Sequence, residues 1–238
     1  MLKFVVVGCG HSATRYMSRF FTQLGIPCGH EDIFSRAGIL ENEKLVGDAS
    51  WRAMPYLDKF EGIVFHQVRH PLPVISSLIW LGKNRGLDEW KAHVDVDCPV
   101  EIAAMRIYTR WNRMCEQGNP YFRYQIENIT PELIFAFCLV IGMPRSLEDI
   151  KFLIEKMPQK INYHNKKIIP WESLPECDEK AELVKLSRRY KYNPEIFEEK
   201  KRKYQWRHTC GHIHVDEYPP DSCPKCNNQG KWMIINWY

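Results

Sequence analysis

The sequence Phe4-Val-Val-Val-Gly-Cys-Gly-His-Ser-Ala-Thr-Arg-Tyr16 decides the fold of this chain. Its continuous apolar run, from Phe4 to Val7, is typical of a strand buried on both faces of a parallel sheet. Two glycines, Gly8 and Gly10, then break the strand, and apolar side chains recur at helical spacing over residues 16–24. A strand, a glycine-rich turn and a helix direct backbone N–H groups and the positive end of the helix dipole at one point. This order predicts an anion site, most often for phosphate.

The side chains of the turn add further hydrogen-bond donors. Ser12 and Thr14 carry hydroxyl groups, and His11 and Arg15 carry positive or hydrogen-bonding groups. The plain alternative is a sharp strand-to-helix turn that binds no ligand. The number of donors that converge on the turn favours the anion site.

The turn does not have the composition of an ATP-binding Walker A loop. Such a loop carries a Lys that reaches the β- and γ-phosphates, followed by a Ser or Thr that holds magnesium. Here no Lys lies between Lys3 and Lys44, and Ala13 replaces the second loop glycine. The sequence therefore disfavours a kinase or an NTPase.

The composition indicates an ordinary globular protein. The 238 residues provide enough chain for one α/β domain and a small appendage. The net charge of +4 suits a small anionic ligand at least as well as a nucleic acid. We find neither a signal peptide nor the roughly 18 consecutive apolar residues that a membrane span needs. Most of the nine cysteines stand singly, which indicates reduced thiols and predicts a cytoplasmic protein without a membrane partner.

Periodicity and turn signals place the remaining elements. We expect residues 82–99 to form an excursion or lid, and composition to change near residue 195. The expected elements are a helix begun near Asp48, a strand over 63–68, a helix over 72–81, a helix over 100–117, a strand over 121–126, and a helix from Thr130 to Gly142 with Pro131 at its first position.

A second anion site is predicted after the strand over 63–68. Arg69 follows that strand, at the carboxyl end where open α/β sheets bind ligands. Ser77 lies eight residues further on, about two turns into the next helix. A guanidinium and a hydroxyl in this arrangement can hold a second anionic group. Alternatively, Arg69 pairs with a carboxylate and Ser77 packs between helices.

Together the two elements resemble the sulfotransferase family that uses 3′-phosphoadenosine 5′-phosphosulfate (PAPS). Its members carry [K/R]-S-G-T-T/R-aromatic after a strand, and later R-x-P with a Ser eight residues after the Arg. The resemblance implies a three-layer α/β domain over residues 1–200, with a parallel sheet and a P-loop-like strand–loop–helix. Residues 11–15 would hold the 5′-phosphosulfate, Arg69 and Ser77 the 3′-phosphate, and Tyr16 would stack on adenine. The cofactor-binding residues implied in this way are Gly10, His11, Ser12, Ala13, Thr14, Arg15, Tyr16, Arg69 and Ser77.

Two positions depart from the family pattern. Ala13 replaces a glycine, which should be tolerated unless its φ is positive. His11 replaces the Lys or Arg that stabilises the bridging oxygen of the leaving phosphate. A protonated His11 could supply that charge, and Arg15 could also reach inward. Sulfuryl transfer depends mainly on in-line positioning and electrostatic stabilisation, so this replacement predicts a slower or pH-dependent reaction, or a binder without activity.

The acceptor hydroxyl needs a general base. Some family members use a Glu about eighteen residues past the loop Thr, and Glu31 lies seventeen residues past Thr14. Glu31 is the first candidate and His30 the second, and a plain surface carboxylate remains an alternative for Glu31. Asp48 and His66 are weaker candidates, because His66 falls within a buried strand. The expected catalytic residues are thus His11, Arg15 and Glu31.

Residues 204–238 resemble a rubredoxin-like zinc ribbon. Cys223-Pro-Lys-Cys226 places two thiolates three residues apart on a tight turn, and Cys210 belongs to a second knuckle whose first Cys is replaced by Arg207. Three thiolates and one imidazole suit a tetrahedral Zn²⁺ better than iron. We expect a structural zinc held by His208, Cys210, Cys223 and Cys226, with His212 and His214 as alternatives to His208.

The sequence therefore predicts PAPS-dependent transfer of a sulfuryl group to a hydroxyl or an amine. The acceptor would be a small molecule, a carbohydrate or a peptide, and its identity stays open, as does the oligomeric state. The alternatives are a nucleotide-binding module without activity, whose ribbon contacts a protein or nucleic acid, and a divergent P-loop small-molecule kinase. The basic run over 200–203 lies beside two glutamates and is typical of a solvated face, which disfavours a nucleic-acid partner.

Overall fold

The computed structural model describes residues 2–35, 38–157 and 167–197, and beyond these residues 204–208, 213–216, 226 and 232–237. The chain separates into two compact units, Met1–Ile196 and Phe197–Tyr238. The elements of the first unit are β1 (Phe4–Val7), α1 (Thr14–Gln23), β2 (Cys28–Gly29), β3 (Phe34–Ser35), β4 (Gly38–Ile39), β5 (Gly47–Ala49), η1 (Trp51–Lys59), β6 (Ile63–Val68), α2 (Pro71–Arg85), η2 (Asp88–Trp90), α3 (Val100–Gln117), β7 (Phe122–Gln125), η3 (Ile126–Asn128), α4 (Pro131–Val140), α5 (Leu147–Lys156), η4 (Trp171–Ser173) and α6 (Asp178–Arg189).

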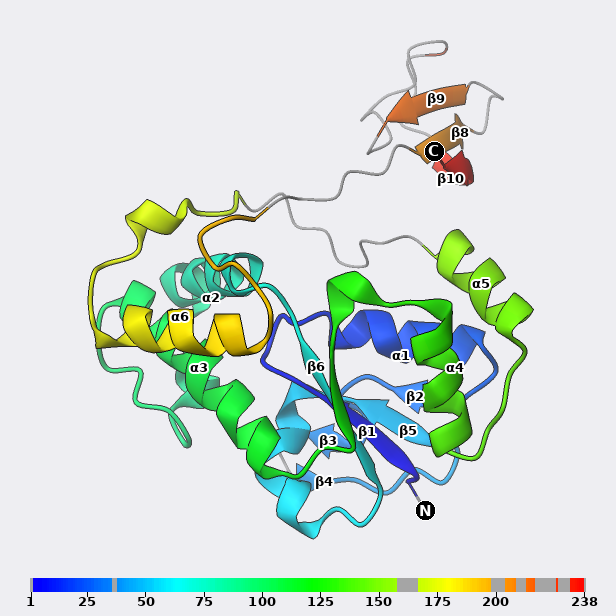
Figure 1. Ribbon diagram of the computed structural model, residues 1–238, viewed down its shortest axis with the longest axis horizontal. Helices are drawn as coiled ribbons and strands as arrows, with labels where there is room; N and C mark the ends of the chain where they lie inside the picture. The colour runs from blue at the N-terminus through cyan, green and yellow to red at the C-terminus, as the bar shows by residue number, and fades with distance from the viewer. Residues whose placement is uncertain are drawn as a thin grey trace. The chain divides into compact units, whose positions relative to one another are not determined.

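The first unit is built on a parallel sheet with the strand order β2-β5-β1-β6-β7 (Figure 1). The chain begins in the central strand β1, continues to β2 and β5 on one side, and then crosses to β6 and β7 on the other. The order in which the chain adds strands to the sheet therefore reverses between β1 and β6, whose Val7 and His66 are partners in register. The predicted α/β class is confirmed, and so is the burial of Phe4–Val7, whose side chains are fully buried.

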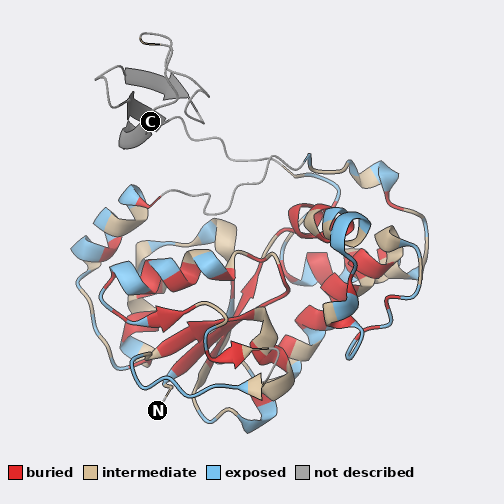
Figure 2. Cartoon of the chain, turned by 180° about the vertical axis from the view of Figure 1, so that it is seen from behind, coloured by how far each residue is buried: buried red, intermediate tan, exposed pale blue. Residues whose placement is uncertain are grey.

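Helices cover both faces of this sheet (Figures 1 and 2). On one face α1 and α4 enclose an aromatic core, in which the rings of Phe65 and Phe137 stack with centroids 4.5 Å apart. On the other face α3 packs against β6, and α2 and α6 pack against α3. There His66 contacts Asn112 of α3, with Nε2 and Oδ1 3.0 Å apart. The sheet is buried between the two layers, so ligands reach it only at its edges.

Two predicted elements differ from the structure. Asp48 does not begin a helix but lies within β5, because residues 47–49 pair with β1. The helix begins at Trp51, and Ser50 caps it by accepting a hydrogen bond from Arg52 N. Residues 82–99, predicted to form an excursion or lid, begin as helix and continue as an excursion between α2 and α3 that packs against the unit. Helix α2 extends to Arg85, and Trp90 is buried, with its ring stacked on Trp51 at 4.9 Å.

The other predicted elements agree with the structure. The helix over 100–117 and the strand over 63–68 have the bounds expected of them. Thr130 caps α4, because its Oγ1 accepts a hydrogen bond from Leu133 N at 3.2 Å. Among the described residues, we find no helix with the length and apolar character that crossing a membrane requires.

The second unit contains an antiparallel sheet of β8 (Tyr204–His208), β9 (Ile213–Asp216) and β10 (Trp232–Trp237), in the order β10-β8-β9. Of the predicted zinc ligands, His208 ends β8, and Cys226 is a half-buried thiol. Cys210 and Cys223 lie outside the described residues, as does His212.

Candidate anion-binding site at the carboxyl edge of the sheet

The loop between β1 and α1 holds two residues in the left-handed region of backbone conformation. His11 and Ala13 both have φ of 67°. A side chain with a Cβ pays roughly 1–2 kcal/mol for this conformation. The sequence predicts that Ala13 is tolerated unless its φ is positive. Its φ is positive, so the loop carries backbone strain. Ala13 also occupies the N-cap position of α1 without a side-chain acceptor to cap the first amides of the helix.

Both loop glycines are closely packed, Gly8 against backbone and Gly10 against a side chain. A Cβ on Gly8 would lie 2.3 Å from the backbone oxygen of Gln67, and one on Gly10 would lie 3.0 Å from Cζ2 of Trp90. The loop is thus pressed against β6 and against the buried Trp90. This packing fixes the path of the backbone amides that follow.

Gln67 of β6 holds the loop by a hydrogen bond from its side chain. Its side chain is fully buried, Nε2 donates a hydrogen bond to Ser12 O, and Oε1 accepts one from Tyr124 OH at 2.6 Å. Sequence analysis missed Gln67, although a glutamine inside a strand of otherwise apolar residues is a signal that could have found it. A buried amide must find partners, and the loop is one of them.

Two hydroxyl groups lie within the loop, in different environments. Thr14 Oγ1 lies 3.3 Å from His30 Nε2, across from the end of β2. Ser12 is fully buried, and its Oγ has no hydrogen-bond partner among the residues that the structure describes. A buried hydroxyl without a partner costs free energy. A bound ligand that accepted a hydrogen bond from it would recover that free energy.

Arg69, from the second predicted anion site, lies against the loop of the first. Its Nη1 donates a hydrogen bond to His11 O at 3.0 Å, and Tyr108 OH donates one to the Arg69 carbonyl at 2.7 Å. The contact exists because β1 and β6 are parallel neighbours, so the residues after each strand emerge at the same edge. Ser77 is half-buried in α2. Tyr16 is also half-buried, and its ring lies against Phe20 with centroids 6.2 Å apart.

The structure brings both candidates for the general base to the same edge. His30 and Glu31 follow β2, and Glu31 adopts a left-handed φ of 61°. Arg52 holds the Glu31 carboxylate, with Nε and Oε2 3.3 Å apart, and its Nη2 contacts Glu89 at 2.8 Å. Glu31 is therefore not a detached surface carboxylate.

Burial shifts the protonation of both groups. Burial, reinforced by the charge of Arg15, lowers the pKa of His30 to about 4, so His30 is neutral at pH 7. Burial raises the pKa of Glu31, while the charge of Arg52 opposes the rise. The separation of 3.7 Å between His30 Nε2 and Glu31 Oε1 is consequently a contact of a neutral ring with a carboxylate.

The two weaker candidates for the base have structural roles. Asp48 is fully buried and accepts hydrogen bonds from the backbone N–H groups of Asp32, Ile33 and Phe34 at 3.2–3.4 Å. His66 is fully buried against α3, and burial lowers its pKa to about 4. Both side chains are buried inside the unit.

The carboxyl ends of four parallel strands thus supply the candidate site. β1 provides the strained loop and the start of α1, β6 provides Arg69, β2 provides His30 and Glu31, and β5 leads into Arg52. Positive groups, the N-terminus of α1 and a neutral imidazole at one edge can bind an anion and accept a proton. Comparison with protein-family models, with curated proteins and with solved structures finds no match to this chain.

Proposed function

We propose that the first unit binds PAPS and transfers its sulfuryl group to a hydroxyl or an amine. The observation that carries the proposal is the hydrogen bond from Arg69 Nη1 to His11 O at 3.0 Å. It places a guanidinium beside the strained loop, at the point where the strand order reverses, and such points are where α/β sheets bind nucleotides. This contact supports a single site made of the loop and Arg69, in which a ligand with two anionic groups would be held.

Each residue has a defined role in this proposal. The loop over residues 11–15 and the N-terminus of α1 bind the 5′-phosphosulfate, apart from the Ser12 amide, which donates to Cys9 O at 3.0 Å, and Arg69 and Ser77 bind the 3′-phosphate. PAPS supplies a sulfuryl group whose bond to the 5′-phosphate oxygen breaks as the acceptor oxygen or nitrogen attacks sulfur. His11 and Arg15 stabilise the negative charge on the leaving phosphate oxygen. The acceptor proton passes to Glu31, or to the neutral His30.

Calorimetry with three ligands tests the nucleotide class. We expect adenosine 3′,5′-bisphosphate to bind without magnesium and more tightly than ADP or ATP. Arg69→Ala should weaken this binding more than Ser77→Ala, since it removes a charge-assisted contact, and Lys59→Ala on η1 serves as the control. Tighter ATP binding that depends on magnesium would overturn the proposal in favour of a kinase.

The rate as a function of pH tests the role of His11. If its cationic form stabilises the leaving group, turnover falls as the pH rises through the pKa of this residue. His11→Lys should then flatten the alkaline limb of the profile. An unchanged profile would assign the charge to Arg15 instead. Bisphosphate binding without turnover of any acceptor would favour the nucleotide-binding module.

We also propose one structural zinc ion in the second unit, held by His208, Cys210, Cys223 and Cys226. The donor set supports the proposal, since three thiolates and an imidazole suit tetrahedral zinc. Metal analysis should return about one equivalent of zinc per chain. Cys223→Ser should release it and leave bisphosphate binding intact, whereas a metal-free chain with a folded second unit would refute the site.

The cysteines support the proposal of a cytoplasmic, reducing location. The described cysteines are free thiols, and several of them, such as Cys9 and Cys115, are fully buried. Structural disulfides accumulate instead in proteins of oxidising compartments.

A further inference from the structure

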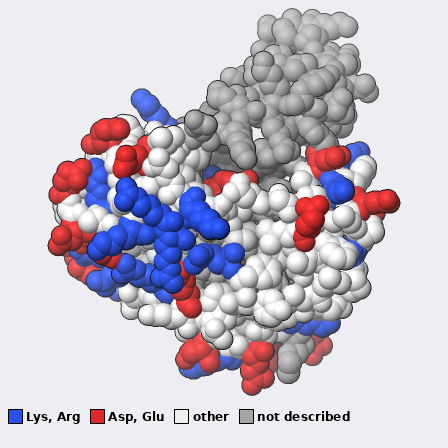
Figure 3. All heavy atoms as spheres, in the orientation of Figure 1, with Lys and Arg blue, Asp and Glu red and all other residues white. Residues whose placement is uncertain are grey.

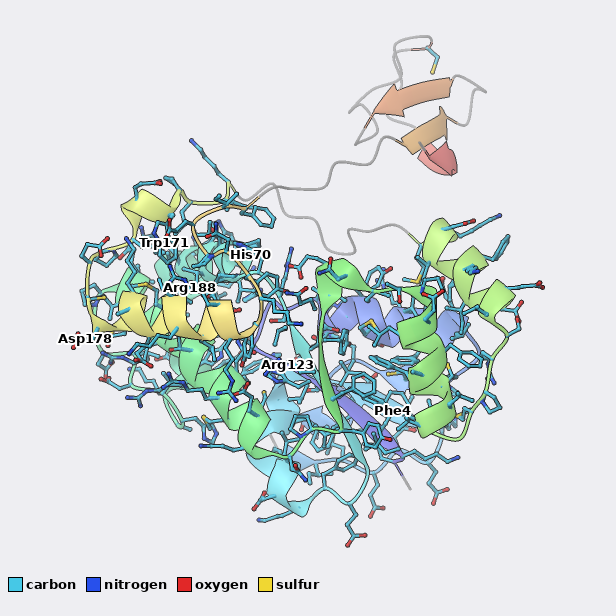
Figure 4. All side chains as sticks on the ribbon, in the orientation of Figure 1. Phe4, His70, Arg123, Trp171, Asp178 and Arg188 are labelled. Carbon is cyan, nitrogen blue, oxygen red and sulfur yellow. The ribbon has the colours of Figure 1, made fainter. Side chains whose placement is uncertain are left out.

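Basic side chains gather on the outer surface of α3, α6 and the neighbouring strand β7. Figure 3 shows this concentration of Lys and Arg, and Figure 4 labels Arg123 and Arg188, which come from β7 and α6. We call this surface the α3–α6 basic face; its cations are exposed and comprise Arg110, Arg113, Arg123, Lys185, Arg188 and Arg189.

Ion pairs hold part of the face in place without neutralising it. Glu116 contacts Arg123 Nη1 at 2.6 Å and Arg189 Nη1 at 3.3 Å. Glu182 likewise contacts Arg113 and Lys185, the latter at 2.9 Å. Each of these carboxylates is thus shared by two cations, so its pair keeps a net positive charge.

The remaining two cations of the face are uncompensated. Within the described part of the chain, Arg110 and Arg188 make no ion pair. Arg110 lies three residues before Arg113 and Arg188 three residues after Lys185, so each extends the charged row on its own helix. The face therefore combines cations fixed by shared carboxylates with cations free to contact a partner.

The composition of the face indicates the chemistry of its partner. Five of its six cations are arginines, whose guanidinium groups bind phosphate oxygens in a bidentate manner. The nearby aromatic rings of Tyr108 and Tyr190 are buried, and Arg123 covers the Tyr190 ring at 4.4 Å. Beside the face, Tyr121 next to β7 exposes a single ring, whereas surfaces that bind single strands carry several rings on which successive bases stack.

We propose that the α3–α6 basic face binds duplex nucleic acid through its phosphate backbone. A rigid duplex presents dense, regular negative charge and needs no apolar contact. A protein partner would favour aromatic and apolar anchors at the centre of its interface. The proposal revises the expectation drawn from the sequence, because the modest overall charge of +4 conceals a local concentration of arginine.

Fluorescence anisotropy with a labelled 20-base-pair DNA duplex of mixed sequence tests the proposal on the full chain. We expect binding that weakens steeply as salt rises from 50 to 200 mM. The variant Arg110→Gln/Arg188→Gln leaves no carboxylate without a partner, and it should lower the affinity at 50 mM salt by at least about tenfold. The slope of log affinity against log salt should become shallower by about two.

A matched control and two competitors decide between the alternatives. Lys44→Gln/Lys59→Gln removes two exposed cations from other elements and should leave duplex affinity unchanged. An equal loss in this control, or no loss in the Arg variant, would overturn the proposal and assign binding to the overall charge or to the second unit. Displacement of the duplex by adenosine 3′,5′-bisphosphate would place it in the nucleotide site instead. Stronger binding to phosphatidylserine vesicles than to the duplex would indicate a membrane surface and also refute the proposal.

Discussion

Two turns lead from neighbouring parallel strands into helices, and they solve this connection differently. The turn from β6 into α2 is short: His70 is the N-cap, its Nδ1 accepts a hydrogen bond from Leu72 N at 3.3 Å, and Pro71 begins the helix (Figure 4). The turn from β1 into α1 spans residues 8–13, has two left-handed residues, and ends in Ala13, which cannot cap. The first turn uses favourable local chemistry throughout, and the second does not.

The difference separates a structural turn from a candidate binding turn. Good caps and a proline at the first helical position stabilise a helix without any ligand. Left-handed residues and an uncapped helix start are unfavourable in the free protein, and the first amides of an uncapped helix remain available to an anion. We infer that the first turn is kept for ligand binding, and the following predictions challenge or refine that contrast, from the largest expected effect to the smallest.

The largest effect is expected for Gly8→Ala. The new Cβ would lie 2.3 Å from the backbone oxygen of Gln67, so the loop and β6 must move apart. We expect a loss of at least about 3 kcal/mol in the free energy of unfolding, measured with urea. Gly10→Ala is the matched comparison, because its Cβ would meet the Trp90 side chain at 3.0 Å, and that ring can tilt. Equal losses in the two variants would contradict the close packing at Gly8.

Gln67→Leu should have the next largest effect. It leaves Ser12 O and Tyr124 OH buried without their partner, which costs about 2–3 kcal/mol of stability. The freed loop should also bind adenosine 3′,5′-bisphosphate more weakly. Tyr124→Phe provides the control, since it removes one hydrogen bond to Gln67 but keeps the one to the loop. If Tyr124→Phe weakened bisphosphate binding as much, Gln67 would not act through the loop.

His70→Ala tests the capped turn and should cost about 1 kcal/mol at pH 7.5. Burial lowers the pKa of His70, so the folded protein keeps the neutral ring that accepts from Leu72 N. The cap is present above the unfolded pKa of about 6.5 and is lost as the pH falls through the lower folded pKa. The stability difference between wild type and His70→Ala should therefore shrink between pH 7.5 and pH 5.

His70→Asn is the matched control for this pH dependence, because asparagine caps a helix without titrating. The stability of His70→Asn relative to His70→Ala should not change with pH. His30 and His66, whose pKa values burial lowers to about 4, destabilise every variant alike as the pH falls, and they cancel in these differences. A constant difference between wild type and His70→Ala would show that the cap contributes nothing and that His70 acts through packing and its Nε2 contact with Asn193 O at 2.9 Å.

The sequence was sufficient to predict what depends on local pattern. The apolar run of Phe4–Val7 predicted the central strand, and Arg69 was placed at the carboxyl end of a second parallel strand. Parallel strands have only one carboxyl edge, so the meeting of Arg69 with the loop follows from the fold class. The base candidates His30 and Glu31 follow β2 at the same edge for the same reason.

Other features depend on contacts distant in sequence. Gln67 holds Ser12, which lies 55 positions earlier in the sequence, and no local pattern specifies that pairing. The local sequence around Asp48 predicts a helix start. Its carboxylate instead accepts hydrogen bonds from the backbone N–H groups of residues 32–34, and β5 pairs with β1, so these distant contacts override the local signal. Backbone strain is equally hidden, because the sequence shows an alanine at position 13 but not its φ.

Ala13→Gly should give the smallest effect and one of opposite sign. Glycine adopts the left-handed conformation without a steric cost, so the substitution should raise the free energy of unfolding by about 0.5–1 kcal/mol, after the entropy of the unfolded glycine is taken into account. Ala181→Gly, on the exposed side of α6, should instead lower stability by about 1 kcal/mol. If both variants were destabilised alike, Ala13 would carry no strain in solution. The stabilised Ala13→Gly protein should also retain its affinity for adenosine 3′,5′-bisphosphate, since the loop amides keep their positions.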